Sequence, residues 1–340
     1  MELQIINENL SSKRDNNLLS IGTKQTGVNP KQVKTNPFIE ANTIDVGLTH
    51  LQKDCNVPVF AKDNEMTLSH QEFIEIAYGC AEKVFKNQSL DTPEIRVSHQ
   101  VKGRTPDAIH IPAKDLLDNQ KTVYYERMAF IIRLPGINGT LKGNTNNLSL
   151  CLGGVRAYNH ENLYSKKSIE KFKFFIGFQN MVCCNLCIST DGFKSEIRAS
   201  SHQELESKIT EVIQSYKMSE HLKEMTKLLD DSLNEQQFAQ LLGKAKLYNF
   251  LPKEEKALLP EVILNDNHFN TMAKDYYQDK SFCKNDSGEI SLWNAYNLLT
   301  GANKSSYIDT FLDRGENAYA FAQGISKAIN GDSQYRWFLS

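Results

Sequence analysis

The hydrophobic pattern of this chain changes its period near residue 200, and that change limits the folds open to it. Between residues 94 and 199, apolar and polar residues alternate in short runs that end at turn-forming residues, as in antiparallel strands. After residue 200, apolar residues recur every three or four positions, which is typical of amphipathic helices. Helices do not alternate with the strands, as they would in a doubly wound sheet. We therefore predict an α+β fold, with an antiparallel β-meander in the middle of the chain and a helical C-terminal region.

The same pattern divides the 340 residues into three parts. Residues 1–36 are rich in Asn, Lys, Gln and Thr and offer few apolar side chains, so we predict a flexible polar arm. Residues 37–200 are predicted to form an α+β domain with the antiparallel sheet. Residues 201–340 are predicted to form a helical region packed on that domain.

The element boundaries follow from turn and capping signals. Ser69 with Glu72, and Ser201 with Glu204, have capping-box spacing and predict helices at 70–86 and 202–217. Gly301 is placed to end a helix that begins near residue 291. The further expected helices are 220–229, 235–250, 268–277, 291–300, 305–313 and 315–329. The expected strands are 55–62, 94–101, 123–134, 148–158, 172–188 with an interruption at Gly177, and 195–199.

Charge is spread unevenly although the net charge is only −2. Residues 91–200 contain 15 Lys and Arg against 10 Asp and Glu, a net of +5. Residues 201–340 contain 15 against 20, a net of −5. Two surfaces of opposite sign suggest two different partners, although complementarity between the two parts of the chain explains the same numbers.

The cysteines and the N-terminus indicate where such a protein works. Seven cysteines, an odd number without disulfide-framework spacing, suit a reducing compartment. Residues 7–17 are too polar for a signal-peptide core, and no apolar run is long enough to span a membrane. We expect a cytoplasmic protein without a membrane partner.

Motifs for enzyme chemistry are weak. Cys184 and Cys187 have metal-ligand spacing beside Cys183, but a second ligand pair at suitable spacing is missing. Lys304 and Ser305 look like the end of a phosphate loop, but Asn303 stands where that loop needs glycine. We therefore expect no metal, no cofactor and no recognised catalytic residue. An enzyme of unrecognised type stays an alternative, with polar candidates at Asn185, Asp191 and Asp309.

Basic residues interleaved with aromatic ones favour nucleic-acid binding. In a strand, Lys171, Lys173 and Phe175 would share one face, which suits a phosphate backbone and a stacked base. A half-buried strand with solvated lysines fits the same alternation, and this alternative stays open. The residues predicted to contact nucleic acid are Lys171, Lys173, Arg127, Arg133, Arg96, Lys102, Arg104, Tyr124, Phe175 and Lys304, with Lys304 at a helix N-terminus.

Several segments carry a resemblance to a known family. They are Ser98-His99-Gln100-Val101-Lys102-Gly103-Arg104, Phe175 to Leu186, Leu292 to Thr300 running on to Asp309, and the Trp337-Phe338-Leu339 end. Together they resemble a family of uncharacterised proteins encoded on conjugative elements and related mobile DNA of gut-type bacteria, over most of the chain from about residue 36. More distantly, a Val-Cys-x-Asn element and an Ala-Tyr-Asn-Leu-x-Thr-like element are similar to a broader phage- and plasmid-borne uncharacterised family. The resemblance implies a DNA-mobilising context and no catalytic residue.

These observations lead to one functional hypothesis and two alternatives. The hypothesis is a non-enzymatic nucleic-acid-binding protein of a mobile genetic element, for example one that binds or anneals single-stranded DNA. The first alternative is a protein-interaction module, such as a host-defence antagonist, and the second is the unrecognised enzyme named above. Nucleic acid is the expected partner, and a homo-oligomer is left open.

Overall fold

The computed structural model describes residues 37–55, 67–108, 110–141, 147–160 and 169–340. The expected polar arm at 1–36 and most of the expected strand at 55–62 lie outside these residues. Of that strand only Cys55 is described, and it follows a helix, α1 (Leu48–Lys53).

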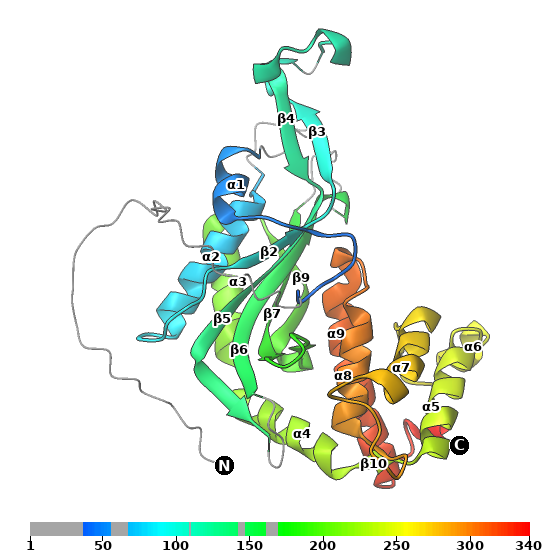
Figure 1. Cartoon of the computed structure of the whole chain (residues 1–340). Helices are drawn as coiled ribbons and strands as arrows, with labels where there is room; N and C mark the ends of the chain where they lie inside the picture. The colour runs from blue at the N-terminus through cyan, green and yellow to red at the C-terminus, as the bar shows by residue number, and fades with distance from the viewer. Residues whose placement is uncertain (1–36, 56–66, 109, 142–146, 161–168) are drawn as a thin grey trace.

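An antiparallel sheet forms the centre of the molecule (Figure 1). Its long strands make a meander, because β5 pairs with β6 and β6 with β7, all antiparallel. The predicted α+β class, with antiparallel strands in the middle of the chain and helices after them, is confirmed. The strands follow the order β1 (Ile44–Asp45), β2 (Glu94–Val97), β5 (Arg127–Thr140), β6 (Asn147–Ala157), β7 (Glu170–Asn180) and β8 (Leu186–Cys187), and β9 (Phe193–Ala199) also pairs with β7.

Two expected strands are broken where the chain leaves this sheet. The segment 94–101 divides into β2 and β3 (Gln100–Arg104), and the segment 123–134 divides at Glu126 into β4 (Lys121–Tyr125) and β5. Strands β3 and β4 pair with each other in a separate two-stranded sheet. Figure 1 shows this ribbon projecting from the top of the molecule. Alternation predicted the strands correctly, but it contains no signal for the change of sheet.

The break within 172–188 also differs from the prediction. Gly177 continues β7, and the strand ends at Asn180. A turn follows, in which Cys184 has a φ of 59° and its N–H donates to the Asn180 carbonyl. The turn places Cys183 and Cys184 outside the strands and Cys187 in β8.

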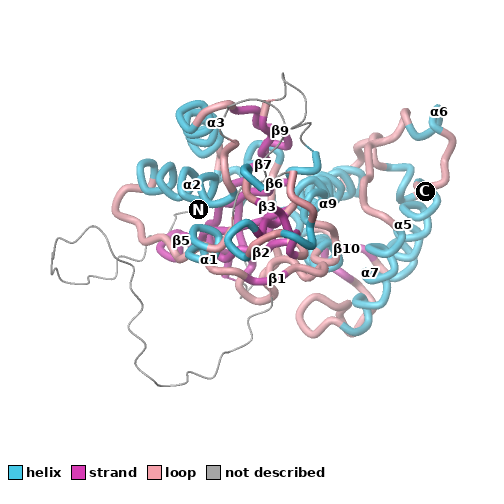
Figure 2. Tube along the Cα trace, turned by 90° about the horizontal axis from the view of Figure 1, so that it is seen from above, coloured by secondary structure: helices cyan, strands magenta, loops and turns pink. Residues whose placement is uncertain are grey.

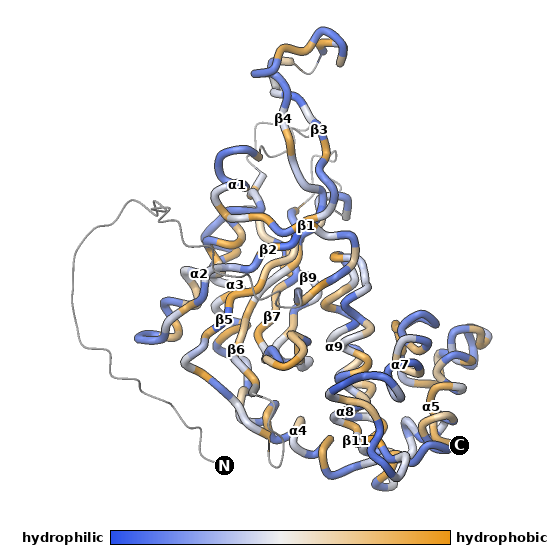
Figure 3. Tube along the Cα trace, in the orientation of Figure 1, coloured by the Kyte–Doolittle hydropathy of each residue, from blue (hydrophilic) through white to orange (hydrophobic). Residues whose placement is uncertain are grey.

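One face of the sheet is covered by α2 (His70–Val84) and α3 (His202–Ser215), as the views in Figures 1 and 2 show. Helix α2 begins with the predicted capping box between Ser69 and Glu72. Its Phe73 is fully buried against Phe130 and Phe172 of the sheet. Figure 3 colours much of β5, β6 and β7 as hydrophobic. The core between these layers extends into the C-terminal helices.

The other face of the sheet is covered by α9 (Ile308–Ile329), which contacts β5, β6, β8 and β9. The prediction divided this helix at residue 314, but the helix is continuous. Gly315 lies inside it, and a Cβ atom there would sit 3.5 Å from Ile188. The glycine therefore serves the close approach of helix and sheet and does not end the helix. Gly301 likewise does not end α8 (Leu292–Asn303).

The remaining helices extend from this face and form the helical C-terminal region (Figure 1). The C-terminal aromatic segment docks there, since Phe338 is buried against Tyr248 and Phe321. No helix among the described residues is both long and apolar enough to cross a membrane. The elements of this region are α4 (Met218–Asp230), α5 (Glu235–Tyr248), α6 (Lys253–Lys256), α7 (Asp266–Gln278) and the short strands β10 (Ser232–Leu233) and β11 (Ile290–Ser291).

Candidate nucleic-acid interface

The β3–β4 ribbon brings like charges together. Arg104 of β3 lies directly opposite Lys121 of β4 in the antiparallel register, and Lys102 lies opposite Val123. Residues directly opposite each other project from the same face, and so do residues two apart in a strand. One face of the ribbon therefore carries Lys102, Arg104 and Lys121. Like charges opposite each other destabilise a strand pair, so this arrangement suits an anionic partner.

The ribbon receives little support from the rest of the chain. Strands β3 and β4 contact mainly each other, and an isolated two-stranded hairpin is only marginally stable in water. Lys102 is exposed. Lys121 Nζ donates to Asp118 Oδ1 at 2.7 Å, and Arg104 donates to the Ile111 carbonyl. The carboxylate of Asp118 is 98% exposed, so it screens Lys121 only weakly.

Tyr124 lies on the opposite face of the ribbon from these cations, since it pairs with Val101. Its ring passes over Gly103, where a Cβ atom would lie 3.7 Å from the ring and 2.6 Å from Thr122 Oγ1. The predicted combination of Tyr124 with Lys102 and Arg104 therefore spans both faces of a thin ribbon rather than one surface.

A second group of predicted residues lines a cavity of about 400 Å³ between the sheet and α9. Lys171 and Lys173 of β7 both project into its lining, as the strand alternation predicted. Each is paired: Lys171 lies 2.7 Å from Glu196 of β9, and Lys173 donates to Asp313 and, at 2.7 Å, to the Asp309 carbonyl. The cavity is lined by Val155, Ala157, Lys171, Phe172, Lys173, Ser195, Glu196 and Asp309.

Arg127 connects the cavity to the ribbon. It begins β5, two residues after the end of β4, and pairs with Ala157 in the cavity lining. Its Nε lies 3.9 Å from Asp309 Oδ2, and its Nη2 lies 3.7 Å from Glu126. Arg127, Lys171 and Lys173 thus gather in one place, but carboxylates lie beside all three.

Phase of the β7 alternation was predicted correctly, but the accessibility of Phe175 was not. Phe175 is 1% exposed and packs in a cluster with Phe311 and Leu312 of α9. The face of β7 that it shares with the two lysines is covered by α9 at this position. A ring buried in this way offers no surface for a base, so Phe175 is removed from the interface.

Three other predicted cations are held in structural contacts. Arg133 is paired with Asp91 and Glu94 at 3.2 Å each and donates to Gln179. Arg96 donates twice to Thr43, at 3.0 and 2.9 Å.

Lys304 is the most deeply placed of these cations. It is 5% exposed, and its ammonium group donates to the Cys183 carbonyl. Because it is buried, it is not at the helix N-terminal surface where we expected a phosphate.

The polar candidates for an unrecognised enzyme make structural contacts as well. The Asn185 amide donates to the Asn297 carbonyl in the core, and Asp191 accepts from Ser189 and from the Lys217 N–H. Asp309 belongs to the cavity described above. Within the described ranges, His, Cys, Asp and Glu side chains form no group of three or more able to hold a metal ion.

Sequence reasoning missed Lys121 and Arg156. Lys121 has a signal only when the register of β3 against β4 is known, because it is nearly twenty residues from Arg104 in the chain. Arg156 is 1% exposed and is paired with Glu170 between the rings of Tyr158 and Phe172. Strand alternation alone could not show that an arginine is buried there.

Comparisons with known proteins identify a family but no activity. A family model matches residues 22–339. The searches of curated proteins and of solved structures give no match. Since the family match extends over almost the whole chain, the chain belongs to the family described as "Domain of unknown function, B. Theta Gene description (DUF3871)".

Proposed function

We propose that the chain is a non-enzymatic nucleic-acid-binding protein of a mobile genetic element, with the β3–β4 ribbon as its main contact. The observation that carries the proposal is the position of Arg104 directly opposite Lys121, with Lys102 on the same face. This cluster is unfavourable for the ribbon by itself and becomes favourable beside phosphates. The mobile-element context rests on the resemblance of the sequence segments described above.

The cavity at the base of the ribbon supplies a second phosphate contact. The Lys171–Glu196 pair is about 40% exposed on both sides, and pairs this exposed contribute about 1 kcal/mol or less. A phosphate group can therefore take the place of Glu196 at a small cost. Lys173 is held more firmly, because its ammonium group has two acceptors on α9.

A single strand is the preferred form of nucleic acid. Tyr124 remains partly exposed on the ribbon, and an unpaired base can stack on an aromatic ring whatever its sequence. A strand that wraps the ribbon would meet cations on one face and this ring on the other. Single-stranded DNA is consequently expected to bind more tightly than a duplex of the same sequence.

The test is fluorescence anisotropy with labelled single- and double-stranded oligonucleotides at several salt concentrations. The double variant Lys102→Glu with Arg104→Glu should weaken binding to single-stranded DNA by at least about tenfold at low salt and reduce the salt slope by about two. The smaller change Lys171→Glu should weaken binding less, because its lysine must first leave Glu196.

The matched control is Lys223→Glu, which reverses an exposed lysine of α4. This variant has the same change in charge for each residue, so it separates contact from general charge. The proposal fails if the wild-type chain shows no salt-dependent binding, or if Lys223→Glu weakens binding as much as a ribbon substitution does.

A protein-interaction module is the second candidate, and an apolar surface favours it. Leu247, Phe250 and Leu258, around the end of α5 and α6, are 59%, 76% and 85% exposed. Exposed apolar groups of this size are more typical of contact surfaces than of free ones. Substituting Phe250 with Ser should leave oligonucleotide binding unchanged if the ribbon carries the function.

A further inference from the structure

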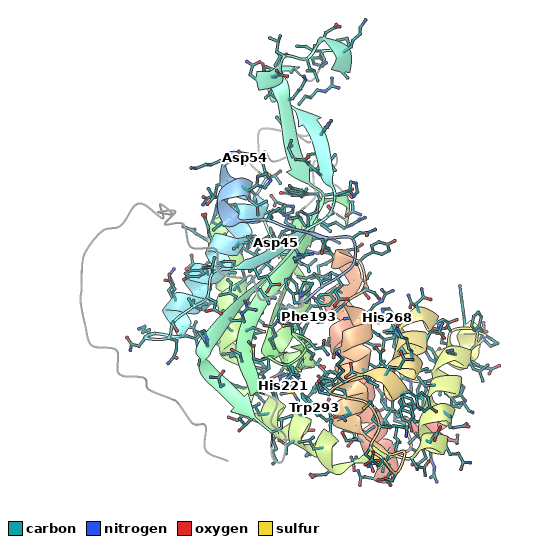
Figure 4. All side chains as sticks on the ribbon, viewed as in Figure 1. Asp45, Asp54, Phe193, His221, His268 and Trp293 are labelled. Atoms are coloured by element: carbon teal, nitrogen blue, oxygen red, sulfur yellow. The ribbon has the colours of Figure 1, made fainter. Side chains whose placement is uncertain are left out.

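Helix α1 and the residue pair that follows it bring together a thiol, an imidazole and a carboxylate. The Cys55 Sγ lies 3.7 Å from His50 Nε2, and His50 Nδ1 lies 2.8 Å from Asp54 Oδ2. The carboxylate is four residues after the histidine and the thiol is five, so one short helix and its end supply the whole arrangement. Figure 4 labels Asp54 beside α1, near the base of the ribbon.

The order of the contacts is the order of a nucleophile, a general base and an orienting acid. A carboxylate on Nδ1 fixes the tautomer that leaves Nε2 free to accept a proton. The nucleophile lies at that second nitrogen, within the distance of a sulfur hydrogen bond. Tyr125 also contacts Nε2, with its hydroxyl at 3.0 Å, and holds the ring in place from the side of the ribbon.

The thiol needs this base. Burial, together with the neighbouring Asp54 carboxylate, raises the pKa of the Cys55 thiol to about 11. The thiol is therefore protonated near neutral pH and attacks slowly unless a base removes its proton in the same step.

A small pocket beside the thiol shows what kind of group could enter. Its volume is about 20 Å³, room for one group the size of a water molecule. Cys55, His70, Tyr124 and Tyr158 contribute to its lining.

His70 adds an acceptor to that lining. Its side chain is 6% exposed, and its Nε2 lies 2.8 Å from the Tyr125 carbonyl. Burial lowers the pKa of His70 to about 3, so the ring is neutral and its Nε2 carries the proton. Nδ1 is then a buried acceptor that no described residue satisfies. A buried acceptor of this kind favours a bound hydrogen-bond donor.

We propose that Cys55, His50 and Asp54 form an acyl-transfer site that takes short acyl groups from activated esters or thioesters. Cys55 Sγ forms a bond to the acyl carbon while its proton passes to His50 Nε2. The bond between the acyl carbon and the leaving oxygen or sulfur breaks, and the leaving group takes the electron pair and the proton from His50. Water then attacks the Cys55 thioester, again with His50 as base, and releases the acid and the free thiol.

The substrate class follows from the pocket. An acetyl group fits a space of this size, whereas a long acyl chain does not. This site is independent of the proposed nucleic-acid interface, since none of Lys102, Arg104 and Lys121 takes part in it.

The test uses the full chain and p-nitrophenyl acetate at several pH values, with nitrophenolate release and peptide mass mapping as readouts. The expected result is acetylation mainly at Cys55 near neutral pH, faster than the same reaction with p-nitrophenyl octanoate. His50→Ala should lower the acetylation rate of Cys55 by about a hundredfold at neutral pH. In that variant the rate should rise steadily toward pH 11, because hydroxide replaces the base.

Asp54→Asn is the conservative variant, since its side chain is 64% exposed and its loss should leave the fold intact. It should lower the rate by less than His50→Ala does. The matched control is Cys283→Ser, which removes another partly exposed cysteine and should leave the rate unchanged.

Two results would overturn the proposal. One is acetyl spread over the partly exposed cysteines without preference for Cys55 in the wild-type chain, a measurement that requires no variant. The other is a folded His50→Ala chain whose neutral-pH rate equals that of the wild type.

Discussion

The sheet and the ribbon are built from the same alternating pattern, yet their charged residues have opposite fates. In the sheet, α2 and α3 cover one face and α9 covers the other, so Lys173 and Arg127 lie beside carboxylates of α9. In the ribbon, no helix covers β3 or β4 in the described part of the chain, and Arg104 and Lys121 face each other. A cation on a strand is therefore a structural partner or a binding group according to what packs over that strand.

The difference has an energetic cause. Charges that lose water on folding need opposite charges nearby, because leaving one buried without a partner costs several kcal/mol. Charges on the ribbon keep their water and need no partner. This is why the predicted interface shrinks from ten residues to the ribbon and one cavity.

The largest expected effect is on a buried cation of the sheet. Arg156→Met removes the partner of Glu170 from a site where the arginine is 1% exposed. We expect the free energy of unfolding to fall by about 3–5 kcal/mol, measured by urea denaturation. Lys102→Met on the ribbon is the comparison and should change it by less than about 0.5 kcal/mol. Equal effects would contradict the contrast between the two regions.

The next effect is a dependence of stability on pH from buried histidines. Burial lowers the pKa of His70 from 6.5 to about 3. Below pH 6.5 the unfolded chain binds a proton that the folded chain does not, so stability is lost as pH falls toward 3. His70→Gln should flatten this dependence by about 1.4 kcal/mol per pH unit between pH 6 and 4, measured by urea denaturation at each pH. His99→Gln, at an exposed histidine next to the ribbon, is the control and should leave the slope as it is.

The smallest expected effect compares two glycines. A Cβ atom at Gly154 in the sheet would lie 2.5 Å from the Phe73 ring of α2 and 2.7 Å from the Lys173 carbonyl oxygen. Gly154→Ala should therefore cost about 1–3 kcal/mol. At Gly103 in the ribbon the nearest atom is a side-chain hydroxyl that can rotate away, so Gly103→Ala should cost less, about 1 kcal/mol or below. Thermal denaturation of both variants checks the order, and a larger loss at Gly103 would show that the ribbon is packed more tightly than it looks.

Much of the fold could be predicted from local patterns. The capping signals at Ser69 and Ser201 marked the starts of α2 and α3, and their side chains accept the N–H of Glu72 and Glu204. The break at Glu126 and the continuity of α9 through Gly315 could not be predicted. Both depend on distant segments: the first on where the ribbon leaves the sheet, and the second on Ile188 beside the glycine.

The candidate site was predicted less completely. Spacing correctly placed Lys171 and Lys173 on one face of a strand and Lys102 with Arg104 on another. It could not show that α9 covers Phe175, or that Lys121 lies opposite Arg104. The relay of His50, Asp54 and Cys55 is local in sequence, but its geometry required the orientation of the histidine ring that Asp54 and Tyr125 hold.

The sequence by itself determined the class of the fold, the two kinds of secondary structure and their order, because periodicity and capping act between neighbours in the chain. Only the tertiary structure decided which strand faces are covered, which cations have carboxylates beside them and which remain in water. Those outcomes depend on contacts between residues far apart in the chain, and burial, which sets the cost of an unpaired charge, exists only once these segments have come together.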